Sequence, residues 1–450
     1  MVKPRQADST LKLIDEYCRY YRNLFSEVRS FEAFTYLHAG IISDIKRKTL
    51  PAIAEIMGLE NAQGLHHFLT QSPWEAQASI RQRLELILKT VKDRKIIIII
   101  DETGDPKKGK ATDYVARQYL GRLGKIDNGR VAVVSYGLVD GLTFPLIFEI
   151  YKPKERLKLK DSYLSKPQIA SQMIREIKAM GFEIDCVLAD SLYGESTSIF
   201  IRSLQGLNLQ FAVAIRSNHS VRLPPEQRVR ANKWRKFERI FSDDSREVRY
   251  TREIIYEKKR ALRYWEITTD IETLPENSIW YVMTQISRVL AKEVGNLYGN
   301  RTWVEYGFRQ SKSELEWTDG RVTQYSQIEK WWEIVCSAYL MISLYTKSNT
   351  AVNSRTSSPS TSSAKNCPIL HSFEQHQDWA EKNSWKINLN NLRLMLQPLI
   401  SFNLMQQWLK VFPIPQLSRG LTRLRALMNF YPNPFSHLIN ESEFLFSSAA

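Results

Sequence analysis

The sequence has few cysteines, and none of them is paired. Cys18, Cys186, Cys336 and Cys367 are scattered, and no Cys-x-x-Cys spacing occurs. This excludes the common zinc-binding spacings and the disulfide framework of a small secreted protein. Unpaired cysteines are typical of a reducing compartment, so we expect a cytoplasmic protein.

Long apolar runs are also missing. The longest, Ile334 to Tyr345, spans about twelve residues between Glu333 and Lys347, whereas a membrane-spanning helix needs roughly twenty. The first ten residues are polar and charged, unlike a signal peptide. We therefore expect no membrane association, and we interpret the run as a buried helix.

Several nucleophile and phosphate motifs are absent. No Gly-x-Ser-x-Gly elbow occurs, and Cys186 falls in a predicted buried strand, which argues against serine and cysteine hydrolases. The segment Gly104 to Lys110 lacks the complete P-loop pattern, which argues against kinases and P-loop NTPases.

The chain carries a surplus of positive charge. The 63 Lys and Arg residues against 48 Asp and Glu leave a net charge of +15. Binding a polyanion releases condensed counterions, so nucleic acid is the favoured partner. With 450 residues, 43% hydrophobic and 25% charged, the chain is expected to form several globular domains.

Residues 1–92 show helical spacing and no strand alternation, which predicts a helical N-terminal DNA-binding domain. Two short helical segments separated by Gly58 to Glu60 favour a helix-turn-helix. A helical bundle with a solvated basic face fits the same pattern equally well. The candidate phosphate contacts of this domain are Arg47, Lys48, Arg81 and Arg83.

From residue 93 to 346 the pattern predicts an α/β catalytic domain. Five consecutive isoleucines, Ile96 to Ile100, indicate a strand buried on both faces. Asp140-Gly141 marks a hairpin between two further strands. The expected order is strand, strand, strand, helix, strand, helix, strand, with these bounds: Ile96–Ile100, Val131–Val139, Thr143–Tyr151, Pro167–Met180, Cys186–Ala189, Thr197–Leu204 and Phe211–Ile215.

A strand-rich insertion is predicted at 217–275. Between Pro225 and Trp265 it carries 13 basic and 7 acidic residues, a surplus that fits a DNA-facing surface or simply a solvated face. A strand at Ile279–Ile286 and one helix across Lys292–Leu315 follow, and a further helix runs to about Tyr345.

The last part of the chain is predicted to be a flexible linker and a helical region. Residues 347–366 are rich in Ser, Thr and Asn, as linkers are. Residues 367–450 form the helical C-terminal region, whose leucines we assign to packing.

Two aspartates follow buried strands. Asp101 comes directly after the five isoleucines, and Asp190 comes after Val187-Leu188-Ala189. Strand ends in α/β sheets are where ligands bind. Either residue alone fits a structural cap; two such residues favour a site.

A third group falls on one helical face. Tyr298, Arg301, Glu305 and Lys312 are spaced by three, four and seven residues. An exposed face with an ordinary Arg301–Glu305 ion pair has the same spacing, so this group by itself does not define a site.

Together these motifs resemble the insertion-sequence DDE transposases. Tyr298, Arg301, Glu305 and Lys312 match the Tyr-x2-Arg-x3-Glu-x6-Lys signature of one branch at every spacing. The segment around Asp101 is similar to that branch's first acidic motif, and the segment around Asp190 to its second. One departure is that Trp303 stands one position later than the family's tryptophan. The resemblance covers residues 95 to 345.

The resemblance implies a ribonuclease-H-like catalytic core with a strand-rich insertion. Asp101, Asp190 and Glu305 would be the catalytic residues and the metal ligands, and they would hold two Mg²⁺ or Mn²⁺ ions. Carboxylates suit such hard cations, and two metals can drive displacement at phosphorus. The predicted strand order independently places the first and fourth strands side by side, which would bring Asp101 and Asp190 together.

The resemblance also implies DNA contacts. Its substrates would be the terminal repeats of the element and target DNA. A homodimer would bind them, and the DNA-bound protein would lie at the bacterial nucleoid. Some members pass through a hairpin with a flipped base, on which a tryptophan stacks. The candidate DNA-binding residues are Tyr298, Arg301, Lys312, Lys107, Lys108, Trp303 and Trp280.

Two other functions remain open from the sequence. A metal-dependent endonuclease on the same fold would carry the same carboxylates without joining strands. A non-catalytic DNA-binding protein derived from a transposase is the alternative from another class, although binding alone gives no reason for three carboxylates so placed.

Overall fold

The structure is a computed structural model, which describes residues 5–221, 229–241, 245–256, 262–276, 278–286, 290–356, 384–429 and 435. The chain forms two compact units: residues 1–83 with 310–450 make up the first, and residues 84–309 the second. This division differs from the predicted domains, because the N-terminal and C-terminal helices belong to one unit. We describe each unit by itself.

The first unit is helical in its described part, as predicted. None of the helices in the described ranges combines the length and apolarity that crossing a bilayer requires. The elements are α1 (Lys12–Arg19), α2 (Val28–Ile42), α3 (Leu50–Ile56), α4 (Gln63–Thr70), α11 (Tyr325–Thr356), α13 (Trp385–Val411) and α14 (Pro415–Met428), with 3-10 helices at Arg22–Leu24 and Trp317–Asp319 and a π-helical turn at Gln310–Glu314. Helix α5 (Ala76–Thr90) begins in this unit and continues into the second.

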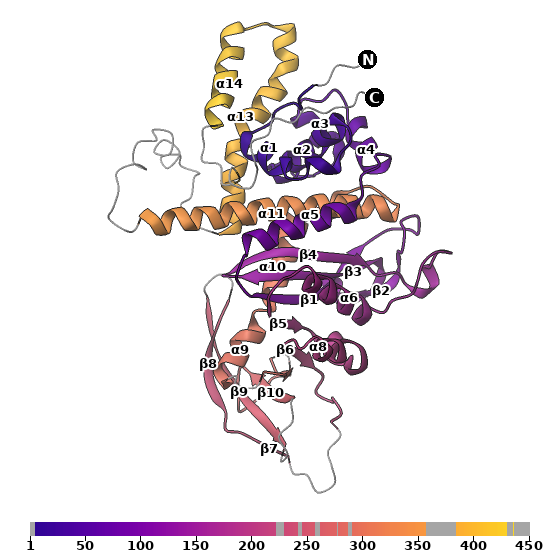
Figure 1. The fold of residues 1–450 in the computed structure, drawn as a ribbon, viewed down its shortest axis with the longest axis vertical. Coiled ribbons are helices and arrows are strands. Elements are labelled where there is room, and N and C mark those ends of the chain that lie inside the picture. Colours follow the sequence, from indigo (N-terminus) through magenta and orange to yellow (C-terminus); the bar gives the residue numbers. More distant parts are fainter. Residues whose placement is uncertain are drawn as a thin grey trace. The chain divides into compact units, whose positions relative to one another are not determined.

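The centre of this unit is the long helix α11, drawn in orange in Figure 1. Its apolar run, Ile334 to Tyr345, is buried, which confirms the prediction of a buried helix. It packs against α2 and α13. Since α11 extends to Thr356, the first part of the predicted linker is helical; residues 357–383 lie outside the described residues.

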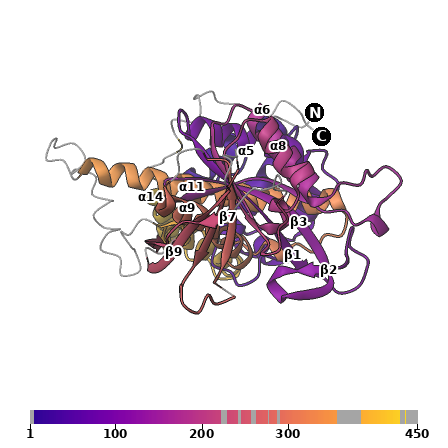
Figure 2. The same cartoon turned by 90° about the horizontal axis from the view of Figure 1, so that it is seen from below.

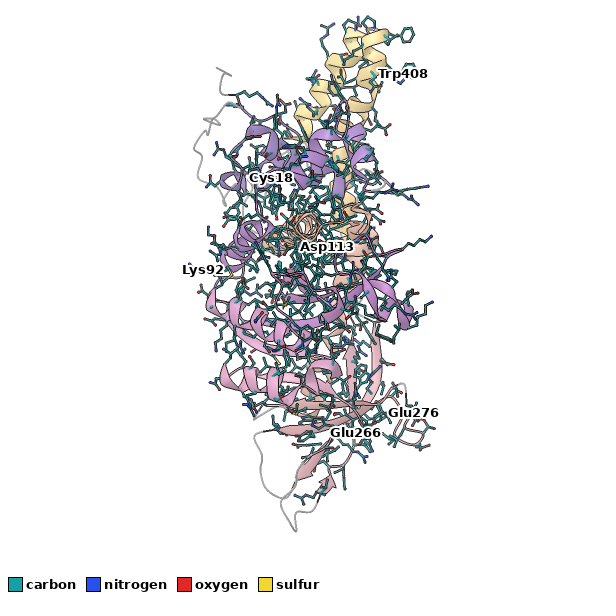
Figure 3. The ribbon with its side chains drawn as sticks, turned by 90° about the vertical axis from the view of Figure 1, so that its right-hand side faces the viewer. Cys18, Lys92, Asp113, Glu266, Glu276 and Trp408 are labelled. Carbon is teal, nitrogen blue, oxygen red and sulfur yellow. The ribbon has the colours of Figure 1, made fainter. Side chains whose placement is uncertain are left out.

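The C-terminal helices α13 and α14 lie within the described residues 384–429. Pro398 lies inside α13 without ending it. The first half of α13 is buried, whereas its last turns expose Trp408, which Figure 3 labels on these helices. The packing role predicted for the leucines therefore holds for the first half of α13.

A buried ion pair joins α5 to α11. Arg83 Nε and Nη2 donate to the Glu333 carboxylate at 2.9 and 2.8 Å, and neither side chain is exposed to solvent. Lys48 is also buried, and its ammonium group donates to the Ser43 carbonyl. Arg83 and Lys48 are thus wrong as predicted phosphate contacts, whereas Arg47 and Arg81 are exposed.

A second polar cluster surrounds His38 on α2. One ring nitrogen lies 2.8 Å from the Phe34 carbonyl, and the other lies 2.8 Å from the Ser337 hydroxyl. Tyr17 donates to the Ser337 carbonyl at 2.7 Å. Burial lowers the pKa of His38 to about 4, against a partly opposing effect of the Phe34 carbonyl.

We expect this buried histidine to make the protein less stable in acid. An unfolded histidine takes up a proton near pH 6.5, whereas His38 stays neutral until about pH 4. The unfolded state therefore binds more protons between these values, and the stability present above pH 6.5 is lost as the pH falls through this window, by up to about 3 kcal/mol. Urea denaturation at a series of pH values measures the effect. His38→Gln should flatten the profile, and an unchanged profile would contradict the assignment.

The second unit is built on one sheet with helices on both faces. Its strands are β1 (Ile96–Pro106), β2 (Ala116–Leu120), β3 (Lys125–Val139), β4 (Leu142–Ile150), β5 (Ile184–Ala189), β6 (Phe211–Ile215), β7 (Val229–Ala231), β8 (Arg235–Ile240), β9 (Arg246–Tyr256), β10 (Arg263–Thr268) and β11 (Trp280–Thr284). Its helices are α6 (Lys166–Ala179), α7 (Ser191–Gly194), α8 (Arg202–Gly206), α9 (Ala291–Gly299) and α10 (Thr302–Arg309), with 3-10 helices at Gly121–Leu123 and Lys154–Arg156 and a π-helical segment at Thr197–Ile201.

The strand order is β2-β3-β1-β5-β6-β11-β10-β9-β7, with β4 on β3 and β8 on β9. Strands β1, β5 and β6 are parallel neighbours, and β3 and β11 flank them in antiparallel pairing. This confirms the predicted strand and helix order up to residue 215 and the adjacency of the first and fourth predicted strands; the structure adds β2. The strands of the predicted insertion, β7 to β10, extend this same sheet.

The two faces of the sheet carry different helices. Along β1 successive side chains alternate between faces. Asp101 contacts Arg301, which immediately precedes α10, whereas Glu102 pairs with Lys166 at the start of α6. Helices α10 and α6 therefore lie on opposite faces. Figure 2 shows α6 and α8 together on one side of strands β1 and β3.

The predicted helix across Lys292–Leu315 is wrong as a single element. Helix α9 ends at Gly299, and α10 begins at Thr302, whose hydroxyl donates to the Gly299 carbonyl at 2.9 Å. Glycine and asparagine are poor helix formers, and Gly299-Asn300 stands at the break. A π-helical turn, Gln310–Glu314, follows α10.

Candidate active site

Asp101 and Asp190 lie next to each other at the edge of the parallel pairing. Ile100 on β1 pairs with Ala189 on β5, and the two aspartates directly follow these paired residues. Strand β1 is longer than the predicted strand Ile96–Ile100, because it continues to Pro106 beside β3. Asp101 therefore lies within β1, just beyond its parallel pairing with β5.

The Asp190 carboxylate caps helix α7. Its Oδ1 accepts a hydrogen bond from the Leu192 amide at 3.0 Å. Helix α7 packs closely on β6, because a Cβ on Gly194 would come within 1.8 Å of the Ala214 carbonyl oxygen. The Ser-Leu-Tyr-Gly sequence after Asp190 thus holds this carboxylate in place through a cap and a close backbone contact.

Arg301 joins the first and third acidic residues. Its Nη1 lies 2.7 Å from Asp101 Oδ2, and its Nη2 lies 3.3 Å from Glu305 Oε1. The Glu305 side chain is 58% exposed, whereas that of Asp101 is 12% exposed. The other carboxylate oxygen of Asp101 accepts a hydrogen bond from the Glu102 amide at 2.8 Å. The structure therefore brings Asp101, Arg301 and Glu305 together.

The electrostatics of Asp101 reflect this crowding. Burial raises its pKa to about 7; the Arg301 guanidinium opposes the shift, and the carboxylates of Asp190 and Glu305 add to it. Burial alone would lower the pKa of Arg301, but Asp101, Tyr298, Glu305 and Asp190 raise it above its ordinary value. The site thus concentrates negative charge that one guanidinium partly compensates.

Two tyrosines border the carboxylates. Burial raises the pKa of Tyr298 to about 12; the Arg301 guanidinium opposes this shift, and the Asp190 carboxylate adds to it. The Tyr193 hydroxyl is fully buried and has no hydrogen-bond partner within the described ranges. Burial and the charges of Glu102, Asp101 and Asp190 raise the pKa of Tyr193. The sequence motif contains Tyr193, but no role was predicted for it.

Other side chains of the protein contact the Trp280 ring. The guanidinium carbons of Arg239 and Arg249 lie 4.7 and 4.2 Å from its centroid, and the Tyr298 ring meets it edge-on at 5.5 Å. Burial lowers the pKa of Arg239 to about 10, with Arg249 adding to the shift. Sequence reasoning missed these two arginines, because nothing in the charged insertion distinguishes a buried arginine from an exposed one.

Trp303 has a more open setting. It lies on α10, packs over Gly141 in the β3–β4 turn, and lines a cleft of about 710 Å³ together with Arg94, Lys95 and Asn300. Of the two candidate tryptophans, Trp303 therefore borders open space, whereas a base would reach Trp280 only if an arginine moved.

The three candidate lysines lie in different settings. Lys107 Nζ is 2.9 Å from Asp105 Oδ2, and Lys108 is exposed beside it. Lys312 lies in the π-helical turn Gln310–Glu314, which belongs to the unit formed by residues 1–83 and 310–450. It is therefore not part of the helix that carries Glu305.

Among the described residues, no three acidic, histidine or cysteine side chains are arranged as a ready metal-binding group. Arg301 lies between Asp101 and Glu305 instead. The donor chemistry nevertheless suits a hard divalent cation, because all three residues offer carboxylate oxygens. The mutual repulsion of Asp101 and Asp190 is also what a bound cation would relieve.

Comparison with known proteins identifies the family. The model of the DDE superfamily endonucleases matches residues 23–248, about half of the chain, and that of the transposase DDE domain matches residues 165–341. The chain belongs to the DDE transposases and is a DNA transposase. Enzymes of this family generally use divalent metal ions.

A curated relative and a solved structure are also similar. The probable transposase for insertion sequence element IS701 of Microchaete diplosiphon is 60% identical over 329 residues, which cover 73% of this chain and 87% of that protein. A cryo-EM structure of a piggyBac transposase synaptic complex with hairpin DNA aligns with 10% identity over 89% of this chain and 77% of that chain, with a TM-score of 0.42.

Proposed function

We propose that the enzyme cuts DNA at the ends of its own insertion sequence and joins the freed 3′-hydroxyl to target DNA, with Asp101, Asp190 and Glu305 as catalytic residues. The pairing of Ile100 with Ala189 supports this most directly, because it brings two aspartates together, and Arg301 links Asp101 to Glu305. The catalytic core would have a ribonuclease-H-like fold.

The carboxylates fit a divalent-metal site, with Mg²⁺ or Mn²⁺ as the expected ions. Asp101, Asp190 and Glu305 would hold these ions through their carboxylate oxygens. Two ions so held supply activation of the attacking oxygen and stabilisation of the leaving oxygen at phosphorus. The hydrogen bond from the Leu192 amide restrains the Asp190 carboxylate at the start of helix α7.

The surrounding side chains would bind the DNA strand. Arg301 can exchange its contact with Asp101 for a backbone phosphate, because a guanidinium binds carboxylates and phosphates in the same geometry. Tyr298 would donate a hydrogen bond to a phosphate, and Lys312 would contact another. Trp303, at the open cleft, would stack on an unpaired base. Lys107 and Lys108 would bind phosphates of the duplex farther from the cleavage site.

Two ends must be cut together, so we propose that the enzyme acts as a homodimer on DNA. Its partners would be the terminal repeats and the target duplex. An endonuclease without strand joining shares the same carboxylates, and the product of the reaction separates the two functions.

The test uses the full-length protein and a labelled fragment that carries one end of the element with its flanking DNA. We expect cutting at the element boundary with Mg²⁺ or Mn²⁺ and none with EDTA. Added plasmid should then acquire the labelled end through its 3′-hydroxyl. Cutting without insertion would support the endonuclease alternative, and binding without any cutting would support a non-catalytic DNA-binding protein.

A further inference from the structure

A two-stranded ribbon at the edge of the sheet exposes apolar side chains. Strand β2 pairs with Lys125–Gly129 at the start of β3, and we call this segment, Ala116–Gly129, the edge ribbon. Tyr119 and Ile126 are directly paired across it, and they are 53% and 61% exposed. A paired tyrosine and isoleucine on a surface ribbon indicate a contact with a partner.

The register of β3 shows which face these side chains occupy. Residues directly opposite each other in an antiparallel pair point to the same face. Asp101 is opposite Val134, so every second residue from Val134 back to Ile126 shares the face of Asp101. Tyr119, opposite Ile126, shares it too.

Two contacts confirm this alternation. Arg130 donates to Asp105 at 3.0 Å, as expected for a pair on one face. Tyr136, two residues beyond Val134, meets the Phe308 ring on α10 edge-on at 5.7 Å. The apolar pair on the edge ribbon therefore lies on the same face of the sheet as the catalytic carboxylate.

The ribbon also has a defined distance from Asp101. Eight residues separate Val134 from Ile126, and at roughly 3.3 Å per residue they span about 26 Å. A B-form duplex rises about 3.4 Å per base pair, so this span corresponds to roughly eight base pairs.

The charge around the ribbon favours DNA as its partner. Residues 105–130 contain seven basic and three acidic residues. Arg117 is exposed opposite Asn128, on the same face as Tyr119. Asn128 Nδ2 donates to the Lys107 and Gly109 carbonyls at 2.6 and 2.8 Å, which holds the basic loop after β1 against the ribbon.

We propose that the edge ribbon lies in a groove of the DNA duplex about eight base pairs from the phosphate at Asp101. Tyr119 and Ile126 contact the groove, and Arg117 contacts a phosphate. The major groove is wide enough for a two-stranded ribbon. The inference rests on the proposed function in one respect, because the distance along the duplex is counted from the phosphate that is cut at Asp101.

The first test places a photo-crosslinking amino acid, p-benzoyl-phenylalanine, at position 119 of the full-length protein. Bound to a duplex with the element end, it should crosslink to bases about six to ten pairs from the cut. A parallel crosslinking experiment uses plasmid DNA that lacks an element end. It distinguishes a contact with target duplex from a contact with element duplex. Crosslinks to a second protein copy, or none to DNA from a protein that still cuts element ends, would overturn the ribbon contact and leave the proposed function standing.

A matched pair of variants provides the second test. Arg117 and Lys125 are both exposed and basic, but Lys125 is opposite Leu120, whose side chain is fully buried on the other face. We expect Arg117→Ala to weaken duplex binding roughly three- to tenfold and to lower the salt dependence by about one phosphate contact, while Lys125→Ala changes binding less than twofold. Equal effects of the two variants would overturn the assignment of the face.

Discussion

Glu305→Gln should reduce cleavage at the element end by on the order of 10³-fold or more, about 4 kcal/mol of transition-state stabilisation. The amide keeps the shape of the side chain but loses the charge that a divalent ion requires. Because the Glu305 side chain is 58% exposed and its ion pair with Arg301 is 3.3 Å long, its loss should leave the folded structure intact.

The measurement compares single-turnover cleavage rates and duplex affinities of the parent and the variant. Affinity should stay within a few-fold, which would place the defect in catalysis. Glu272→Gln, an exposed glutamate of the same unit, is the matched control and should cut normally. If Glu305→Gln cuts as fast as the parent, Glu305 serves only the ion pair with Arg301, and the proposed catalytic group is incorrect.

Glu333→Gln should lower the free energy of unfolding by roughly 3–5 kcal/mol, because it leaves the Arg83 guanidinium buried without a counter-charge. Both nitrogens that Arg83 directs at this carboxylate are within 2.9 Å of it, and solvent reaches neither side chain. Since α5 and α11 lie far apart in the sequence, this pair also ties the N-terminal helices to the late ones.

Guanidinium denaturation followed by tryptophan fluorescence measures the loss. Arg246→Gln breaks an exposed pair with Glu238 at 3.2 Å and should cost less than about 1 kcal/mol. The double variant Arg83→Met/Glu333→Leu, which removes both charges, should recover much of the stability. A Glu333→Gln protein as stable as Arg246→Gln would contradict the account of the buried pair.

Local patterns predicted the catalytic sheet well. Five isoleucines indicate a strand buried on both faces, and Asp140-Gly141 marks a tight turn, so the existence of β1, β3 and β4 follows from neighbouring residues, although β1 and β3 are longer than predicted. The adjacency of β1 and β5 followed from the order of the elements. The spacing of Tyr298, Arg301, Glu305 and Lys312 led to the family even though these residues do not share one helix. Tyr298 lies on α9, Arg301 immediately precedes α10, Glu305 lies on α10 and Lys312 lies in a π-helical turn.

Long-range packing explains where the sequence predictions failed. Arg83 and Lys48 look like exposed cations by composition, and only the position of Glu333 and the Ser43 carbonyl explains their burial. The division into two compact units differs from the predicted domains for the same reason, since α2, α3 and α4 pack with helices that come more than two hundred residues later.

The sequence by itself determined the class of enzyme and most strands, because these depend on residue type and short spacing. Only the tertiary structure decided that Arg301 lies between Asp101 and Glu305, that two arginines cover Trp280, and that Tyr119 and Ile126 share the face of Asp101. Each of these depends on strand register or on contacts between distant segments, which local sequence patterns do not encode.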